Sequence, residues 1–123
     1  MASDPAAVLR ALAECWQRGD AAGAAALFAP DATYSEPPVF AFDGRAAIQG
    51  FFADFVARHH AVTFEVVRVL AAPDGALAAA EWRFTHTRTA DGKAASYAGL
   101  CWIELRDGLV TRWQGYSVVV PPA

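Results

Sequence analysis

Apolar residues recur at a helical spacing near the start of the chain, which predicts a first helix. The stripe consists of Val8, Leu9, Leu12, Cys15 and Trp16. Ser3 or Asp4 can cap this helix, Pro5 suits its first turn, and Gly19 ends it. The helix therefore has one face that must be buried against another element.

Two further helices are expected before residue 60. Asp20 can cap a short one over residues 21–28, which Pro30 stops. A brief strand is expected over residues 32–35, and a third helix begins near Asp43. The apolar face of that third helix consists of Ile48, Phe51, Phe52, Phe55 and Val56.

From Val62 onward the pattern changes to strands. Breaks at "PDG", "ADGK" and "RDG" divide this part into four strands, and each break contains the Asp-Gly pair that favours hairpins. Three helices followed by an antiparallel meander predict one α+β domain over residues 1–123, with the helices on one face of the sheet.

The register of the first clear hairpin decides which side chains face the helices. In its first strand Trp82, Phe84 and His86 point to one side. A two-residue turn at Asp91 and Gly92 places directly opposed residues on a common face. The expected pairs are His86 with Tyr97, Phe84 with Gly99, and Trp82 with Cys101.

The last hairpin has two possible registers. A two-residue loop at Asp107 and Gly108 would pair Ile103 with Arg112 and mix polar with apolar residues on both faces. A three-residue loop that includes Arg106 keeps the faces separate, and we prefer it because a slip by one residue exchanges them. Its expected pairs are Cys101 with Trp113 and Tyr97 with Ser117.

The two faces of the predicted sheet differ in composition. The inner face carries Trp82, Phe84, His86, Tyr97, Gly99, Cys101, Trp113, Gly115 and Ser117. It is either a tightly packed core or a pocket wall, since polar groups under helices need partners, water or a ligand. The outer face carries Arg83, Trp102, Glu104, Arg112, Gln114 and Tyr116. Aromatic residues among arginines are typical of an interface, so we expect a homodimer through this face.

Charge and composition exclude several classes of partner. The 123 residues carry 13 acidic and 10 basic side chains, a net charge of -3, with no basic run for a nucleic acid. No apolar stretch reaches the roughly 20 residues of a membrane span, and the first residues lack the pattern of a signal peptide. The two cysteines form no disulfide framework. We therefore expect a cytoplasmic protein.

The stretch "LFAPDATYSEPPVFAFDGRAAIQGFF", with Gly19-Asp20 before it and "RDGLVTRWQGY" near the end, resembles a known family. It is similar to the SnoaL-like and ketosteroid-isomerase-like branch of the nuclear transport factor 2-like superfamily. The resemblance covers nearly the whole chain. It implies a cone of three N-terminal helices on a strongly curved, mostly antiparallel sheet, with a cavity between them and dimerisation through the sheet.

The resemblance also indicates where a catalytic group would lie. Steroid isomerases of the superfamily place a proton-abstracting aspartate just after the "DAT" strand, and Glu36 falls on that position. Their oxyanion-binding tyrosine falls near Leu12 and their protonated aspartate near Cys101, so their full set of groups is missing here. The late acids fit neither the epoxide hydrolases nor the SnoaL-type cyclases, because two lie in turns and two point outward. These acids are Asp91, Asp107, Glu81 and Glu104.

Glu36 has two interpretations. In an apolar cavity its carboxyl would favour proton transfer in an isomerase, cyclase or hydratase-like step, with His86 or Tyr97 polarising an oxygen. Alternatively it is a partly exposed turn residue in a non-catalytic ligand-binding or dimerisation module. The residues expected around a small apolar organic ligand are Trp16, Tyr34, Phe52, Trp82, Phe84, Cys101, Trp113 and Ser117.

No metal or cofactor is expected. His59 and His60 lack a third ligand at a suitable spacing, and cations that close the third helix are the simpler account. Cys101 would need a base beside it to act as a nucleophile. The chain has no phosphate loop and no dinucleotide fingerprint.

Overall fold

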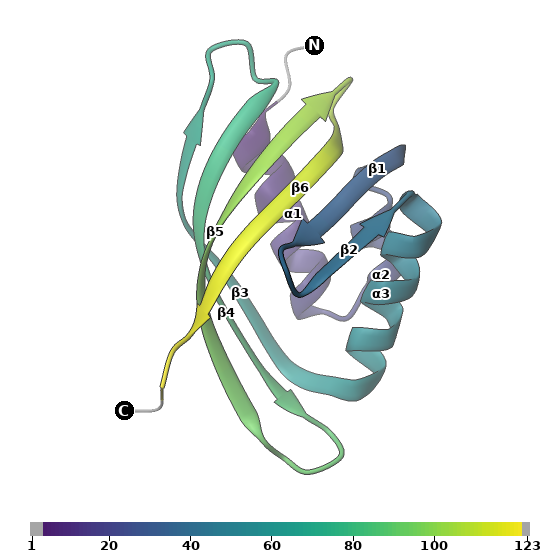
Figure 1. The fold of residues 1–123 in the computed structure, drawn as a ribbon, viewed down its shortest axis with the longest axis vertical. Coiled ribbons are helices and arrows are strands. Elements are labelled where there is room, and N and C mark those ends of the chain that lie inside the picture. Colours follow the sequence, from purple (N-terminus) through teal and green to yellow (C-terminus); the bar gives the residue numbers. More distant parts are fainter. Residues whose placement is uncertain (1–3, 122–123) are drawn as a thin grey trace.

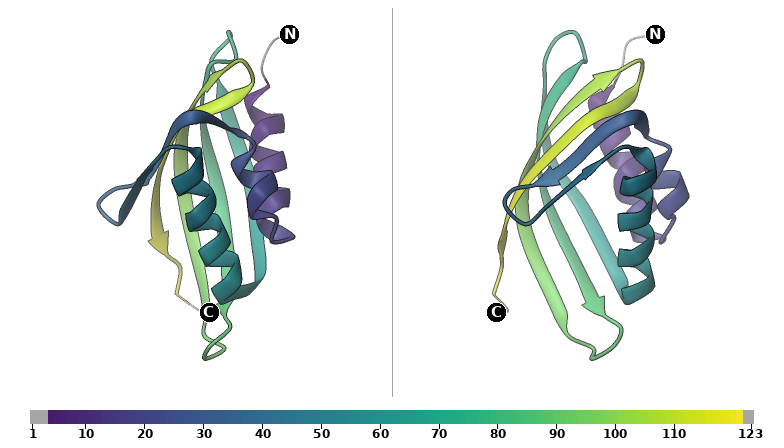
Figure 2. Two further views of the ribbon diagram at one scale, coloured as in Figure 1. Left: turned by 90° about the vertical axis from the view of Figure 1, so that its right-hand side faces the viewer. Right: turned by 45° about the vertical axis from the view of Figure 1, so that its right-hand side comes forward.

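The computed structural model describes residues 4–121 and has three helices on one side of a curved, open sheet (Figures 1 and 2). The helices are α1 (Pro5–Gln17), α2 (Ala21–Ala25) and α3 (Arg45–Arg58). The strands are β1 (Phe28–Glu36), β2 (Phe40–Asp43), β3 (His59–Ala71), β4 (Leu77–Arg88), β5 (Ala94–Arg106) and β6 (Leu109–Val119). The predicted α+β class is confirmed. None of the helices within residues 4–121 is both long and apolar enough to cross a membrane.

Side-chain caps fix where the first two helices begin. The Asp4 carboxylate accepts hydrogen bonds from the backbone N–H groups of Ala6 and Ala7, at 3.1 and 3.3 Å. Ser3, the other predicted cap, lies outside the described residues. Asp20 accepts from Gly23 at 2.8 Å, as predicted for the second helix.

The second helix is shorter than predicted, because the sheet takes its last residues. α2 ends at Ala25, and Phe28 already belongs to β1, where it pairs with Val110 of β6. The Phe28 carbonyl accepts a hydrogen bond from Nε of Arg45 at 2.8 Å, which ties the start of β1 to the start of α3.

The sheet has six strands in the order β2-β1-β6-β5-β4-β3. The predicted meander is β3 to β6, and its neighbours are antiparallel. The prediction missed β2 and most of β1, which lies parallel to β6 and antiparallel to β2. This parallel pairing joins segments about 80 residues apart, so no local pattern in the sequence predicts it.

The β4–β5 hairpin has a register two residues away from the predicted one. The observed pairs are Trp82 with Gly99, Phe84 with Tyr97, and His86 with Ala95. The connection is longer than two residues, because the Asp91 carboxylate accepts from Nε of Arg88 and from the Lys93 N–H, both at 3.1 Å. A two-residue offset leaves every side chain on its predicted face.

The last hairpin combines features of both expected registers. Arg106 pairs with Leu109 across a two-residue turn in which Asp107 and Gly108 both have positive φ, so the preferred three-residue loop is wrong. Thr111 is an extra residue in β6, and its hydroxyl donates to the Glu104 carbonyl at 3.1 Å. The bulge shifts the later pairs, which become Ile103 with Trp113, Gly99 with Ser117 and Tyr97 with Val119. The faces are those predicted, although the individual pairs are not.

Two glycines on the inner face make room for indole rings. A Cβ atom on Gly99 would lie 2.3 Å from the Trp82 ring, and one on Gly115 would lie 2.2 Å from the Trp113 ring. Trp82 and Trp113 are both almost completely buried. The glycines therefore let two tryptophans lie flat against the sheet at the centre of the inner face.

Candidate functional site

A cavity of about 500 Å³ lies between the inner face of the sheet and the helices. Eleven of its eighteen lining residues are aromatic: Trp16, Tyr34, Phe40, Phe51, Phe55, Phe64, Trp82, Phe84, Tyr97, Trp113 and Tyr116. The other seven are Glu36, Pro37, Pro38, Val39, His86, Ser117 and Val119. Such a lining suits a small apolar molecule that meets a few polar groups.

Nine predicted site residues line the cavity: Glu36, His86, Tyr97, Trp16, Tyr34, Trp82, Phe84, Trp113 and Ser117. Phe52 and Cys101 do not, because both lie in the core, where 1% and 3% of their surface is exposed. Phe52 packs against Trp16 and Tyr34, with ring centroids 4.6 and 5.3 Å apart. It supports the wall without forming its surface.

Several lining residues were missed by the sequence reasoning. Phe51 and Phe55 belong to the predicted apolar face of α3, and that stripe was the signal for them. Phe40 had no such signal, since it lies on β2, which was not predicted. Tyr116 belongs to the outer-face prediction, yet it also lines the cavity while 53% exposed.

Glu36 is both a turn residue and a cavity residue. It is the last residue of β1, and its carbonyl accepts from the Val39 N–H at 2.7 Å, which closes the turn into β2. The side chain is half-buried, and the Ser117 hydroxyl donates a hydrogen bond to its Oε1. The parallel pairing of β1 with β6 brings these two residues together.

Tyr34 lies beside this carboxylate in a stack of rings. Its ring centroid is 4.4 Å from that of Trp113 and 5.7 Å from that of Phe40, with nearly parallel planes. Burial, and then the nearby Glu36 carboxylate, raise the pKa of Tyr34 well above its usual range. The phenol therefore stays protonated and can donate a hydrogen bond.

His86 occupies another part of the cavity, in a group of rings. Its centroid lies 4.5 Å from that of His59, 5.0 Å from that of Phe55 and 5.7 Å from that of Tyr97. Burial lowers the pKa of His86 to about 4, and the charges of His59 and Arg88 act in the same direction. At neutral pH it is an uncharged imidazole, and its buried Nδ1 has no hydrogen-bond partner within residues 4–121.

The strand pairs show how far each polar group lies from Ser117, and so from Glu36. Tyr97 is one strand and two residues away from Ser117 along the sheet, which corresponds to about 8 Å between Cα atoms. His86 is two strands and four residues away, or about 17 Å. Along the sheet, Tyr97 therefore lies closer to Ser117 than His86 does.

The sequence disfavoured two other possibilities, a nucleophilic Cys101 and a metal site at His59 and His60. Burial raises the pKa of Cys101 to about 12, so its thiol is not activated. His59 starts β3, and its Nδ1 lies 2.9 Å from the Phe55 carbonyl in the last turn of α3. Within the described residues no three potential metal ligands come together.

Comparison with known proteins gives one family and many solved structures. A family model described as a SnoaL-like domain matches residues 9–113. No curated protein sequence matches the chain at a significant level.

Solved structures of similar fold come from several organisms. A hypothetical protein with a ketosteroid isomerase-like fold from Catenulispora acidiphila, in complex with trimethylamine, is 21% identical with a TM-score of 0.80, over 93% of this chain and 86% of that one. A candidate polyketide cyclase from Xanthomonas campestris pv. campestris is 22% identical with a TM-score of 0.81, over 90% and 87%. An LEH-like epoxide hydrolase from M. tuberculosis is 18% identical with a TM-score of 0.79, over 91% and 80%. At these identities the likeness extends to the fold and not to the reaction.

Proposed function

The chain belongs to the SnoaL-like family, and on that premise we propose a function for its aromatic cavity. It binds a small apolar organic molecule, and Glu36 moves a proton on that molecule in a cofactor-free isomerase, cyclase or hydratase-like step. One observation carries the proposal: a carboxylate, held by the Ser117 hydroxyl, lies on the lining of a cavity whose walls are mostly aromatic.

The proposed proton transfer assigns a role to each polar group near the carboxylate. Glu36 takes a proton from a carbon next to a carbonyl and returns it to another carbon of the same molecule, so the substrate is isomerised without net gain or loss. A hydroxyl of Tyr34 or Tyr97 donates to the carbonyl oxygen while negative charge develops there. Ser117 keeps the carboxylate in place and is a positioning residue.

The site differs from that of a steroid isomerase at the two positions where the sequence already lacks the expected tyrosine and aspartate. The places of the oxyanion-binding tyrosine and the protonated aspartate fall near Leu12 and Cys101, and both of these residues are buried in the core. The stabilisation of a developing oxyanion therefore falls to tyrosines on the strands. This difference favours a related proton transfer on another substrate.

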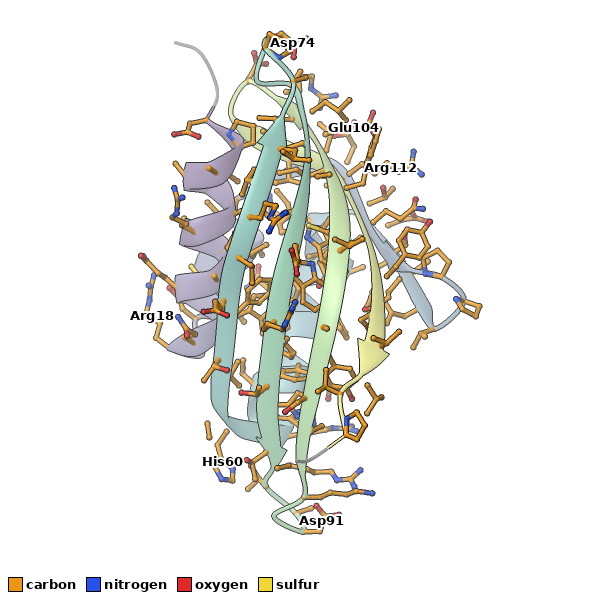
Figure 3. All side chains as sticks on the ribbon, turned by 90° about the vertical axis from the view of Figure 1, so that its left-hand side faces the viewer. Arg18, His60, Asp74, Asp91, Glu104 and Arg112 are labelled. Carbon is orange, nitrogen blue, oxygen red and sulfur yellow. The ribbon has the colours of Figure 1, made fainter. Side chains whose placement is uncertain are left out.

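We also propose that two copies associate through the outer face of the sheet, where no helix covers the strands (Figure 3). Leu100, Trp102, Tyr116 and Val118 are exposed there. Exposed apolar groups of this size, set among charged side chains, are typical of protein interfaces.

A carbon acid tests the catalytic part of the proposal. 2-Tetralone, a small apolar ketone with acidic protons beside its carbonyl, is incubated with the protein in D₂O, and its deuterium uptake is followed by NMR. The protein is expected to accelerate the exchange, and Glu36→Gln to lower that rate at least about 100-fold, the usual contribution of a general base.

The matched control is Glu65→Gln, which changes the same charge at an exposed position of β3 and should leave the exchange rate unchanged. Exchange that is not accelerated, or that survives Glu36→Gln in a folded variant, would contradict the proton-transfer step. The non-catalytic ligand-binding or dimerisation module would then be the better description.

A further inference from the structure

The charged groups at the cavity indicate which ligand charge it would accept, which its shape alone does not. Among the eighteen lining residues there is no lysine and no arginine, and the only acidic side chain is that of Glu36. His86 does not supply a positive charge at neutral pH, because burial keeps its imidazole neutral. The fixed charge at the cavity is therefore a single negative one.

Seven arginines of the chain pair with carboxylates away from the cavity. Seven salt bridges join side chains within residues 4–121, and Glu36 takes part in none of them. Arg112, for example, pairs with Glu104 on the outer face, as Figure 3 shows. The Glu36 side chain is nevertheless half-buried, and its hydrogen bond comes from the neutral hydroxyl of Ser117. A carboxylate in such surroundings is short of a counter-charge.

Aromatic rings surround this carboxylate. Phe40 is directly opposite Glu36 in the antiparallel β1–β2 pair, so the two side chains share a face. Tyr34 lies two residues earlier on the same face and stacks on Trp113. The faces of aromatic rings carry negative potential and attract cations, most strongly where water is excluded. An anionic group placed here would meet a like charge and no cation.

From these charges we propose that the cavity recognises a cationic ligand, namely a quaternary or protonated amine on an apolar body, with the Glu36 carboxylate as its counter-ion. This inference rests on the proposed ligand cavity and specifies the charge of what enters it. The apolar body contacts the aromatic walls, while the positive nitrogen lies at the Glu36 carboxylate, beside the ring of Phe40 on the neighbouring strand. It concerns recognition and does not depend on whether Glu36 also transfers a proton.

Two probes of the same shape separate charge from apolar contact. Benzyltrimethylammonium and neopentylbenzene differ in one atom, a positive nitrogen in place of a carbon, and phenylacetate serves as an anionic probe. Binding is followed by calorimetry and by tryptophan fluorescence, since Trp16, Trp82 and Trp113 line the cavity. The ammonium is expected to bind at least tenfold more tightly than the neutral hydrocarbon, and phenylacetate should not bind. In a cavity without a fixed charge the hydrocarbon would bind more tightly, because it loses no ionic hydration.

Variants show whether Glu36 is responsible for the preference for the cationic probe. Glu36→Gln keeps the size of the side chain and an acceptor for Ser117, and it should abolish the tenfold preference while leaving neopentylbenzene binding unchanged. Glu65→Gln, an exposed control on β3, should keep the preference. Circular dichroism verifies that each variant is folded.

Three results would overturn the inference: equal or tighter binding of the neutral probe, a preference that persists in Glu36→Gln, or binding of neither probe. The exchange experiment with 2-tetralone fails or succeeds independently. A cation preference without exchange supports this inference and removes the catalytic step, whereas exchange without a cation preference does the opposite.

Discussion

On the inner face of strands β4, β5 and β6, indole rings lie over glycines, whereas on the outer face charged side chains pair in solvent. The inner face has no room for one additional carbon at Gly99 or Gly115. On the outer face Glu104 and Arg112 lie 3.7 Å apart while both are about half exposed (Figure 3). The same three strands thus combine a surface defined by close packing with one defined by exposure. Substitutions on the inner face should therefore mainly change the free energy of unfolding, and those on the outer face mainly the association of two copies.

The largest effect is expected from Gly115→Ala on the inner face. The added Cβ would lie 2.2 Å from the ring of Trp113, which is fully buried and stacked on Tyr34, so the ring cannot move aside freely. We expect a loss of about 2 kcal/mol in the free energy of unfolding, the usual size for an overpacked core. Urea titration measures it.

The matched control is Gly50→Ala on α3, where an added Cβ meets no atom within 4 Å. There the same change should stabilise the protein by up to about 1 kcal/mol, since alanine favours a helix over glycine. Equal effects at both positions would show that the contact with the Trp113 ring does not limit the side chain at position 115.

A smaller effect is expected from the pH dependence of His86. Its pKa falls from 6.5 to about 4 on folding, so the unfolded chain binds the proton more readily between these values. The stability that neutral His86 contributes is present above about pH 6.5 and is lost as pH falls towards 4. Because the ring is only half-buried, we expect about 1 kcal/mol after allowance for solvent screening.

His86→Phe keeps a ring in this place and removes its titration. Free energies of unfolding measured at pH 7 and pH 5 should differ less in the variant than in the unaltered protein. The difference between the two proteins isolates His86 from the other titrating groups. An identical pH dependence in both would show that the environment of His86 does not disfavour its charged form.

The smallest effect on the stability of a single copy is expected from Trp102→Ser on the outer face. Trp102 is 46% exposed, so its loss should lower the free energy of unfolding by about 1 kcal/mol or less at low protein concentration. Its effect on association should be larger, because a central aromatic residue often dominates an interface. Analytical ultracentrifugation is expected to find dimers of the unaltered protein and single copies of the variant. Dimers in both would place the contact elsewhere.

The side-chain alternation predicted the two faces, and the reason is the period of two. Trp82, Phe84 and His86 point inward whether the hairpin register is the predicted one or the observed one two residues away. Alternation is unable to distinguish such registers, because both put the same side chains inside. The individual pairs depend instead on the Asp91 loop, whose hydrogen bonds have no simple pattern in the sequence.

The candidate site was only partly predictable, because its central contact joins distant segments. Glu36 was identified from its place after the "DAT" strand, and Ser117 from the face that it occupies in β6. That the Ser117 hydroxyl reaches Glu36 follows from the parallel pairing of β1 with β6, and Phe40 is brought in by β2. Both depend on tertiary contacts that leave no local periodicity.

The extra residue Thr111 shifts the alternation of inward and outward side chains along β6 by one position. Val110 and Trp113 are both buried although they are three positions apart, an odd step that an unbroken strand would turn to opposite sides. Without Thr111, the later side chains of β6 would point to the opposite faces of the sheet. Arg112 and Gln114 would then enter the cavity, and the Ser117 hydroxyl would point away from the Glu36 carboxylate. The position of Ser117 towards the end of β6 thus depends on one extra residue near the start of that strand, which does not line the cavity.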